Sequence, residues 1–309
     1  MTVLEAIRKS ADFLAKKGVE SPRLQTELLL AHLLKMPRMN LYLNFERGLT
    51  PAETDTLREL VKRRGQREPL QHLIGSTSFC GLEMAVNRRA LVPRPETELL
   101  AELGWQFLNR EGSRAGDPGS ETAARRPSPN DFPTALDFGT GTGCIAIALA
   151  VKCPNAKITA MDISADALAL ARENAARNGV AGRIEFLPGD GFAAMAEMSE
   201  RGRPGHPPAF DLIISNPPYI PSAEIDTLQP EVRDFDPRAA LDGGADGLDF
   251  YRMFPAQAKP FLKPGGKIML EFGDGQAEAV RKLFESEKWI VEAVKEDYSH
   301  RARILIARR

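Results

Sequence analysis

The residues with the clearest chemical meaning form a four-residue loop after an apolar segment. Residues 210–215 read FDLIIS and predict a buried strand, which continues directly into Asn216, Pro217, Pro218 and Tyr219. The two prolines restrict the backbone and remove two N–H donors, leaving carbonyl groups and the Asn216 side-chain oxygen as fixed acceptors. The loop therefore predicts a site for an NH2 group.

An amide or aromatic amine is a weak nucleophile because its nitrogen lone pair is delocalised. Hydrogen bonds to the Asn216 side-chain oxygen and the Pro217 carbonyl would favour a pyramidal nitrogen, and Tyr219 can stack on the planar group. Methyl transfer from a sulfonium then needs alignment more than a general base. We predict that Asn216, Pro217 and Tyr219 are catalytic and that Pro218 also binds substrate. A rigid turn with a packing aromatic residue is the alternative.

A glycine-rich segment precedes this loop in the chain. The run from Asp137 to Gly143 reads DFGTGTG and lies between a predicted strand, 134–138, and an apolar helix, 144–151. Glycines at such a turn let a ligand approach the backbone, and the helix N-terminus offers unpaired N–H groups. The dinucleotide pattern would need glycine where Cys144 stands. A nucleotide-like ligand is expected; NAD or a ligand-free packing turn are the alternatives.

Two carboxylates follow at the ends of the next predicted strands. Asp162 is placed to accept hydrogen bonds from ribose hydroxyls. Asp190 would reach an adenine amino group with Phe192 beside the ring, although a simple turn aspartate remains open. These residues together fit S-adenosyl-L-methionine. Its predicted contacts are Gly139, Thr140, Gly141, Thr142, Gly143, Asp162, Asp190, Phe192 and Asn216.

The elements that must position these residues alternate between strand and helix. This order predicts an α/β fold with a mostly parallel sheet covered by helices. The predicted strands are 134–138, 157–162, 183–187, 210–215 and 267–272, with a turn at 263–266 before the last. Segments 289–294 and 303–307 are expected to form an antiparallel hairpin that completes the sheet.

The front of the chain has a different pattern. Residues 1–72 predict a small helical bundle, with helices opening at Ser21–Pro22 and Thr50–Pro51. A basic face at 58–67 is either solvated or contacts an acidic or RNA-bearing partner. Residues 73–95 predict a hairpin-like linker, and 96–309 the methyl-transfer domain. Two segments rich in glycine and proline, Gly112–Pro133 and Ser199–Pro208, are expected to be surface insertions.

Composition excludes several function classes. The 309 residues are 43% hydrophobic with a formal net charge of -1, so no global attraction for nucleic-acid phosphates is expected, and no direct DNA binding. The three cysteines and four histidines show no metal-ligand spacing, which predicts a site without metal. No apolar signal-peptide core or membrane-length run is present, so we expect a cytoplasmic protein without a membrane partner.

At these motifs the chain resembles the protein-(glutamine-N5) methyltransferases of the HemK/PrmC type. The resemblance spans nearly the whole chain, because three further segments match besides Asn216–Tyr219. They are Pro93–Glu98, Leu241–Leu248, and Glu271–Gly273 followed by Gln276. It implies a class I S-adenosylmethionine methyltransferase fold, Rossmann-like, behind a helical substrate-docking domain. The implied substrate is the glutamine of the Gly-Gly-Gln motif in class I peptide chain release factors.

The resemblance also implies roles for single residues. Asn216–Tyr219 would hold the substrate glutamine, and Arg94, Glu96 and Thr97 would lie near the pocket mouth; a charged helix-entry segment is the alternative. The family often has a large aromatic residue where this chain has Gly191, which moves the expected adenine contact to Phe192. An adenine-N6 methyltransferase shares the Asn-Pro-Pro-Tyr loop but needs a basic cleft and a recognition domain. A non-catalytic docking module is the third reading.

Overall fold

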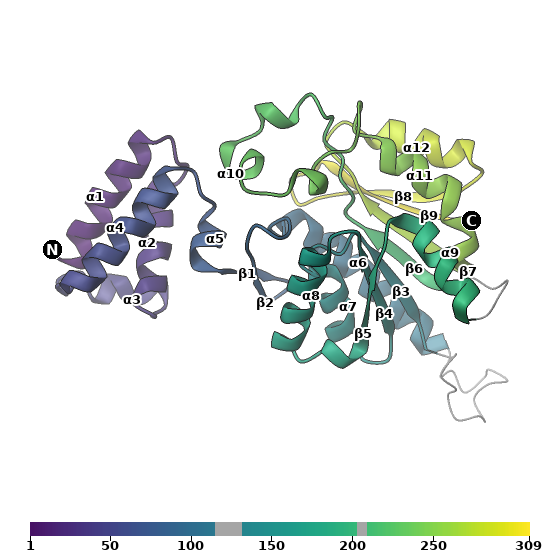
Figure 1. Cartoon of the computed structure of the whole chain (residues 1–309), viewed down its shortest axis with the longest axis horizontal. Helices are drawn as coiled ribbons and strands as arrows, with labels where there is room; N and C mark the ends of the chain where they lie inside the picture. The colour runs from purple at the N-terminus through teal and green to yellow at the C-terminus, as the bar shows by residue number, and fades with distance from the viewer. Residues whose placement is uncertain (115–131, 203–208) are drawn as a thin grey trace. The chain divides into compact units, whose positions relative to one another are not determined.

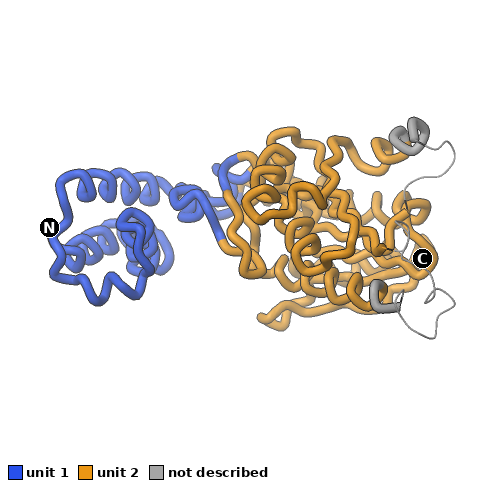
Figure 2. The backbone as a smooth tube through the Cα atoms, turned by 90° about the horizontal axis from the view of Figure 1, so that it is seen from below, with its two compact units in different colours: residues 1–77, 86–88, 227–236 blue, residues 78–85, 89–226, 237–309 orange. Residues whose placement is uncertain are grey.

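The computed structural model describes residues 1–114, 132–202 and 209–309 (Figure 1). The described chain divides into two compact units (Figure 2). Unit 1 contains Met1–Thr77, Val86–Arg88 and Thr227–Asp236, and unit 2 contains Ser78–Ala85, Arg89–Asp226 and Pro237–Arg309. The units therefore do not follow single stretches of sequence. Most of the two predicted insertions, residues 115–131 and 203–208, lies outside the described residues.

Unit 1 is built from helices, and the sequence predicts those near the start of the chain. They are α1 (Val3–Lys16), α2 (Pro22–Leu33), α3 (Arg38–Leu43), α4 (Pro51–Gly65), α5 (Leu70–Ile74) and the short α10 (Pro230–Arg233). Helix α4 begins where expected: the Thr50 side chain accepts from the Glu53 backbone N–H, and Glu53 accepts from that of Thr50. Ser21 precedes α2 in a left-handed conformation and makes no side-chain cap.

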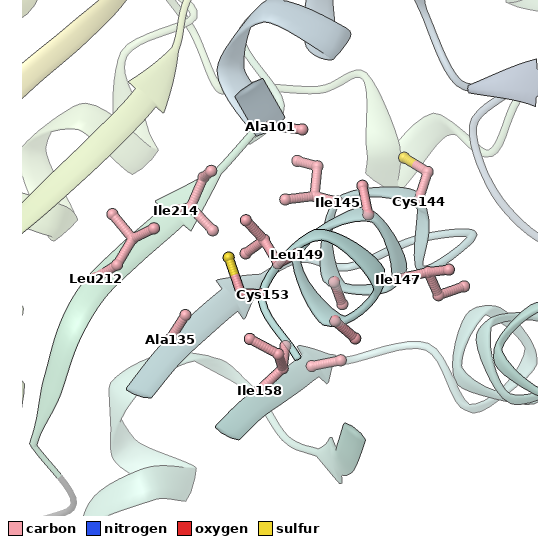
Figure 3. Packing of buried hydrophobic residues seen from close by; sticks show 14 of the residues in the cluster. Ala101, Ala135, Cys144, Ile145, Ile147, Leu149, Cys153, Ile158, Leu212 and Ile214 are labelled. Atoms are coloured by element: carbon pink, nitrogen blue, oxygen red, sulfur yellow. The ribbon is translucent and has the colours of Figure 1, made fainter. Parts of the chain in front are cut away.

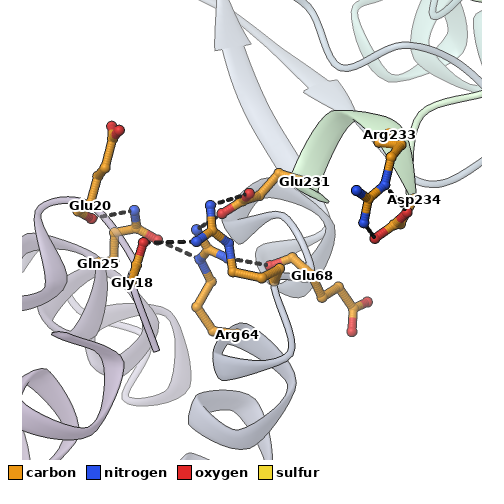
Figure 4. Close-up of polar contacts among 9 residues, drawn as sticks. Gly18, Glu20, Gln25, Arg64, Glu68, Glu231, Arg233 and Asp234 are labelled. Carbon is orange, nitrogen blue, oxygen red and sulfur yellow. Dashed lines mark hydrogen bonds and ion pairs between the residues drawn. The ribbon is translucent and has the colours of Figure 1, made fainter. Parts of the chain in front are cut away.

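An ion-pair cluster holds the segment Thr227–Asp236 in unit 1 (Figure 4). Glu231 accepts from Arg64 Nη2 and from Arg67 Nη2, each at 2.6 Å. The Arg64 side chain is only 4% exposed and that of Glu231 16% exposed. Burial raises the pKa of Glu231, but hydrogen bonds from Arg67 and Arg64 outweigh it and lower that pKa overall. A stretch distant in sequence is thus fixed to the end of α4 and to the residues that follow it by charge-assisted hydrogen bonds.

Replacing Glu231 by alanine is expected to destabilise the protein by about 3 kcal/mol, because Arg64 would remain buried without its carboxylate. Thermal or urea unfolding measures this loss. Asp234→Ala is the control, since its pair with Arg233 is exposed and such pairs contribute about 1 kcal/mol or less. Because the folded-state pKa of Glu231 is lowered, its contribution is present at neutral pH and is lost as acid protonates the carboxyl. Equal stability of the two variants would contradict this account.

Unit 2 contains a seven-stranded sheet of order β5-β4-β3-β6-β7-β9-β8. Its strands are β3 (Thr134–Phe138), β4 (Lys157–Asp162), β5 (Ile184–Pro188), β6 (Phe210–Ser215), β7 (Leu262–Glu271), β8 (Ile290–Glu296) and β9 (Ala302–Arg308). The pairs among β3 to β7 are parallel, whereas β9 pairs antiparallel with β7 and β8. The predicted mostly parallel sheet with an antiparallel C-terminal hairpin is confirmed.

One strand begins earlier than predicted. The expected turn at Lys263–Gly266 lies inside β7, and the register with β6 shifts between Phe210 and Leu212. Glycine and proline mark this irregularity correctly, but the chain passes it without leaving the sheet. A short pair, β1 (Ser76–Phe79) and β2 (Leu82–Ala85), supplies the hairpin expected before the sheet.

Helices cover both faces of the sheet. One layer is α6 (Pro95–Arg114), α7 (Cys144–Lys152) and α8 (Ala165–Arg177); the other is α9 (Gly191–Gly202), α11 (Asp249–Gln257) and α12 (Ala277–Ser286). Successive β6 residues alternate between the layers: Leu212 and Ile214 pack with α7, as Figure 3 shows, whereas Ile213 packs on the opposite side. Burial on both faces explains the three consecutive apolar residues 212–214 of β6.

Two helices extend into the predicted insertions. Helix α6 continues through Gly112 to Arg114, and α9 includes residues 199–202, so these residues are helical where the sequence predicted loops. Short 3-10 turns complete the fold: Ala181–Arg183, Ile225–Thr227, Arg238–Ala240 and Lys259–Phe261. Across residues 1–114, 132–202 and 209–309, no helix combines the length and apolarity that a membrane crossing requires.

Candidate active site

The motifs meet at one edge of the sheet because β4, β3 and β6 are parallel neighbours. The glycine loop follows β3, Asp162 ends β4, and the Asn216 loop follows β6. Ligands of open α/β sheets bind outside the carboxyl ends of the strands. The structure thus brings together the two loops that the sequence singled out separately.

The glycine loop combines a packed glycine with an open one. Gly143 has a φ of 82°, and an added Cβ would lie 3.0 Å from the Ala171 Cβ, so close packing against α8 requires glycine here. Gly139 has a φ of 70°, but an added Cβ would meet no atom within 4 Å. The open position is the one where a ligand can approach the backbone.

Asp162 holds the glycine loop in place through its carboxylate. One oxygen accepts from the Gly141 backbone N–H at 2.8 Å and the other from the Ser164 N–H at 2.9 Å. A carboxylate has about four acceptor positions, so lone pairs remain for ligand hydroxyl groups. The predicted ribose contact therefore has a geometric basis in addition to its spacing.

Two residues beside the glycine loop, Asp137 and Ile163, have no role that the sequence alone predicts. Asp137 is fully buried; its Oδ2 accepts from Thr140 and Ala146, while Oδ1 has no hydrogen-bond partner among the described residues. Burial raises the pKa of Asp137 to about 7. Ile163 is 66% exposed directly after Asp162, an apolar surface where a nucleobase could pack. Asp137 stands out because it is buried and Ile163 because it is exposed, and the sequence pattern shows neither property.

The adenine-side expectations receive less support. Asp190 is exposed after β5, as either a ligand contact or a simple turn residue would be. Phe192 is only 3% exposed; its ring lies among Phe138, Phe254 and Phe261 and stacks on the last at 5.1 Å. The ring belongs to the core cluster of α9 and α11, so nothing in its packing supports the expected adenine contact.

Two other motifs contact the backbone of the Asn216 loop and hold its shape. Gln276 Nε2 donates to the Tyr219 carbonyl at 3.0 Å and to the Gly247 carbonyl at 3.3 Å, while its Oε1 accepts from the Gly273 N–H at 2.8 Å. An added Cβ on Gly247 would lie 2.4 Å from the Tyr219 carbonyl oxygen, and one on Gly243 2.8 Å from the Tyr219 Cα. The segments Leu241–Leu248 and Gly273–Gln276 therefore support the loop through its backbone.

Side chains around the loop range from buried to exposed. Asn216 Nδ2 donates to Thr97 Oγ1 at 3.0 Å, and Thr97 is only 3% exposed. Arg94 is half-buried and Glu96 exposed; both act electrostatically on Tyr219. Burial raises the pKa of Tyr219 to about 12, so its phenol is neutral at physiological pH. The site presents an amide, carbonyl groups and a neutral aromatic ring.

Comparison of the sequence with known proteins identifies the family. Residues 5–75 match the PrmC N-terminal domain and residues 112–229 the methyltransferase small domain. The release factor glutamine methyltransferase of Geobacter sulfurreducens is 42% identical over 92% of this chain and 88% of its own length. The chain belongs to the release factor glutamine methyltransferase family. The Chlorobaculum tepidum member is 41% identical over 96% of this chain and 94% of its own length.

A solved structure agrees on the fold. The catalytic domain of hMettl16, in complex with the MAT2A 3′UTR hairpin 6, covers 83% of this chain and 81% of its own with a TM-score of 0.51. Its sequence is 12% identical, so the similarity concerns the fold alone. Family membership makes the chain a methyltransferase.

Proposed function

We propose that this protein transfers a methyl group from S-adenosyl-L-methionine to the side-chain amide N5 of glutamine in the Gly-Gly-Gln motif of class I release factors. The observation that carries the proposal is that the Asn216 loop and the glycine loop follow neighbouring strands, in a chain whose relatives are named release factor glutamine methyltransferases. The loop offers acceptors for both N–H groups of a primary amide.

The residues around the glycine loop fit this cofactor. Gly139 leaves the backbone open, Asp162 has lone pairs for ribose hydroxyls, and Ile163 offers an apolar surface for adenine. Asp137 is fully buried behind this loop, where its Oδ2 accepts from the Thr140 hydroxyl and the Ala146 N–H. Thr140, Thr142 and Asp190 are further proposed contacts of the cofactor. When bound, the cofactor supplies a methyl group on a positively charged sulfur.

The chain's own contribution is to align the glutamine amide. Asn216 Oδ1 and the Pro217 carbonyl accept its two N–H groups, and Tyr219 lies against its planar face. These contacts turn the nitrogen lone pair toward the methyl group, and alignment lowers the barrier. The nitrogen would bond to the methyl carbon as the methyl–sulfur bond breaks, leaving neutral S-adenosylhomocysteine, and would then release its proton to water. The half-buried Tyr219 phenol stays neutral throughout.

The substrate is a folded protein, and the helices of unit 1 are proposed to dock it in the cytoplasm. A DNA adenine reaction would use the same loop, but the net charge of -1 offers no phosphate attraction. Incorporation of labelled methyl groups into purified class I release factor and into adenine-containing DNA separates the two. Label in the protein alone supports the proposal. Label in DNA alone would show that the substrate is adenine in DNA and not the release factor.

Asp162→Ala is expected to weaken cofactor binding by about 30-fold, equivalent to roughly 2 kcal/mol for charged hydrogen bonds. The variant loses both the ribose acceptor and the bond to the Gly141 N–H. Calorimetric titration with S-adenosylhomocysteine measures the change. Asp166→Ala, an exposed aspartate in the first turn of α8, is the control and keeps the affinity of the unmodified protein. Equal affinities for both variants would exclude Asp162 from the cofactor site.

A further inference from the structure

A buried carboxyl group lies behind the Asn216 loop and has no role in the chemistry described above. Glu271 ends β7 and is only 2% exposed, and its Oε2 accepts no hydrogen bond among the described residues. Burial raises the pKa of Glu271 to about 7, while hydrogen bonds from Thr97 and Asn216 oppose this rise. A carboxyl group kept in such a position is costly unless it has a partner or a function.

Thr97 connects this carboxyl group to Asn216. Its hydroxyl accepts from Asn216 Nδ2 at 3.0 Å and can donate one proton in turn. An ionised Glu271 is an acceptor only, so the hydroxyl proton points to Glu271 and the Thr97 oxygen is left to accept. The donors then point in one direction: Asn216 donates to Thr97, and both side chains donate toward Glu271.

The direction matters because an amide side chain has two nearly isosteric orientations. With Nδ2 held by Thr97, Asn216 Oδ1 is the atom left for the substrate, and a substrate NH2 needs that acceptor. In the opposite orientation, the Asn216 NH2 group would face the substrate NH2 group, and neither could accept a hydrogen bond. We propose that Thr97 and Glu271 act as positioning residues that fix the Asn216 carboxamide with Oδ1 toward the substrate amide. This inference rests on the proposed function.

Protonation of Glu271 removes the directionality. A neutral carboxyl group can donate to Thr97, whose hydroxyl proton is then free to turn toward Asn216. Other charged groups face Glu271 as well: Glu96 at the start of α6 raises its pKa and Arg303 of β9 lowers it. Tyr219 lies nearby, and the Tyr251 hydroxyl donates to the Glu271 backbone carbonyl at 2.6 Å. Methylation is therefore expected to decline as the pH falls through about 7.

Steady-state kinetics of the full chain on release factor test the hydroxyl. Thr97→Val is expected to lower kcat by about 10- to 100-fold with little change in KM, and Thr97→Ser to stay within about 3-fold of the unmodified protein. Thr134→Val is the control, since it loses a hydroxyl bond to Asp211 at the opposite end of β3. If serine fails as badly as valine, the methyl packing of Thr97 matters and the proposal falls.

The pH dependence of the Asn216 side-chain amide signal tests the role of Glu271 separately from side-chain packing. The side-chain amide resonances of Asn216, assigned by their loss in Asn216→Ser, should titrate with a midpoint near 7 in the free protein. Glu271→Gln should remove that titration. An unchanged titration in Glu271→Gln, or none in the unmodified protein, overturns the inference. Because this measurement needs no substrate, it stands even if release factor is not methylated, which would count against the proposed function instead.

Discussion

Replacing Asn216 by alanine is expected to lower kcat for glutamine methylation by on the order of 10²- to 10³-fold, the usual effect of losing one fixed hydrogen-bonding group in an active site. The substrate amide loses the acceptor that turns its lone pair. Cofactor affinity is expected to change much less than kcat, because Asp162 and the glycine loop remain in place. Single-turnover kinetics and calorimetric titration with S-adenosylhomocysteine measure the two quantities separately.

Asn109→Ala is the matched control for this change. Asn109 is an exposed asparagine of α6 that donates to the Lys152 carbonyl, away from the Asn216 loop. It should retain the kcat of the unmodified protein. If Asn216→Ala also keeps its kcat, the amide is not held by this side chain and the alignment account is wrong.

A single methyl group at Gly247 is expected to have a comparably large effect. An alanine Cβ there would lie 2.4 Å from the Tyr219 carbonyl oxygen and 2.8 Å from Gln276 Nε2, at a φ of 75°. The loop must move to make room, and a displacement near 1 Å costs about 100-fold in rate. We expect Gly247→Ala to lose most of its kcat while circular dichroism still reports a folded protein.

Gly265→Ala separates this steric effect from backbone strain. Gly265 has a similar φ of 80°, but an added Cβ would meet nothing within 4 Å. Both variants should lose comparable stability from strain. Only Gly247→Ala should lose activity; similar kcat values for the two would show that contact with Tyr219 and Gln276 does not control the loop.

The sheet was predictable because its signals are local and periodic. The apolar run of β6 and the glycine loop fix nearby positions closely, and β3, β4 and β6 have the predicted bounds, whereas the turn expected at Lys263–Gly266 lies inside β7. The inclusion of Thr227–Asp236 in unit 1 was not predictable. It depends on Glu231 meeting Arg64 across 167 sequence positions, and no local pattern encodes such a partner.

The candidate site divides in the same way. Parallel strand order brings Asn216, Asp162 and the glycine loop to one edge, so motif position was enough to predict their grouping. Burial decides the remaining residues, and a linear pattern does not reveal it. Phe192 is aromatic and close in sequence but lies in the core, whereas Glu271 and Thr97 gain their positions only when β7 and α6 pack beside the loop.

The central claim is that the Asn216 loop directs methylation to a glutamine amide. Tandem mass spectrometry of full-length class I release factor, incubated with this protein and S-adenosylmethionine, tests it most directly. The account predicts one added methyl group, located on N5 of the Gly-Gly-Gln glutamine and absent with the Asn216→Ala variant. A methyl group on any other residue, or one that persists undiminished in that variant, would contradict it.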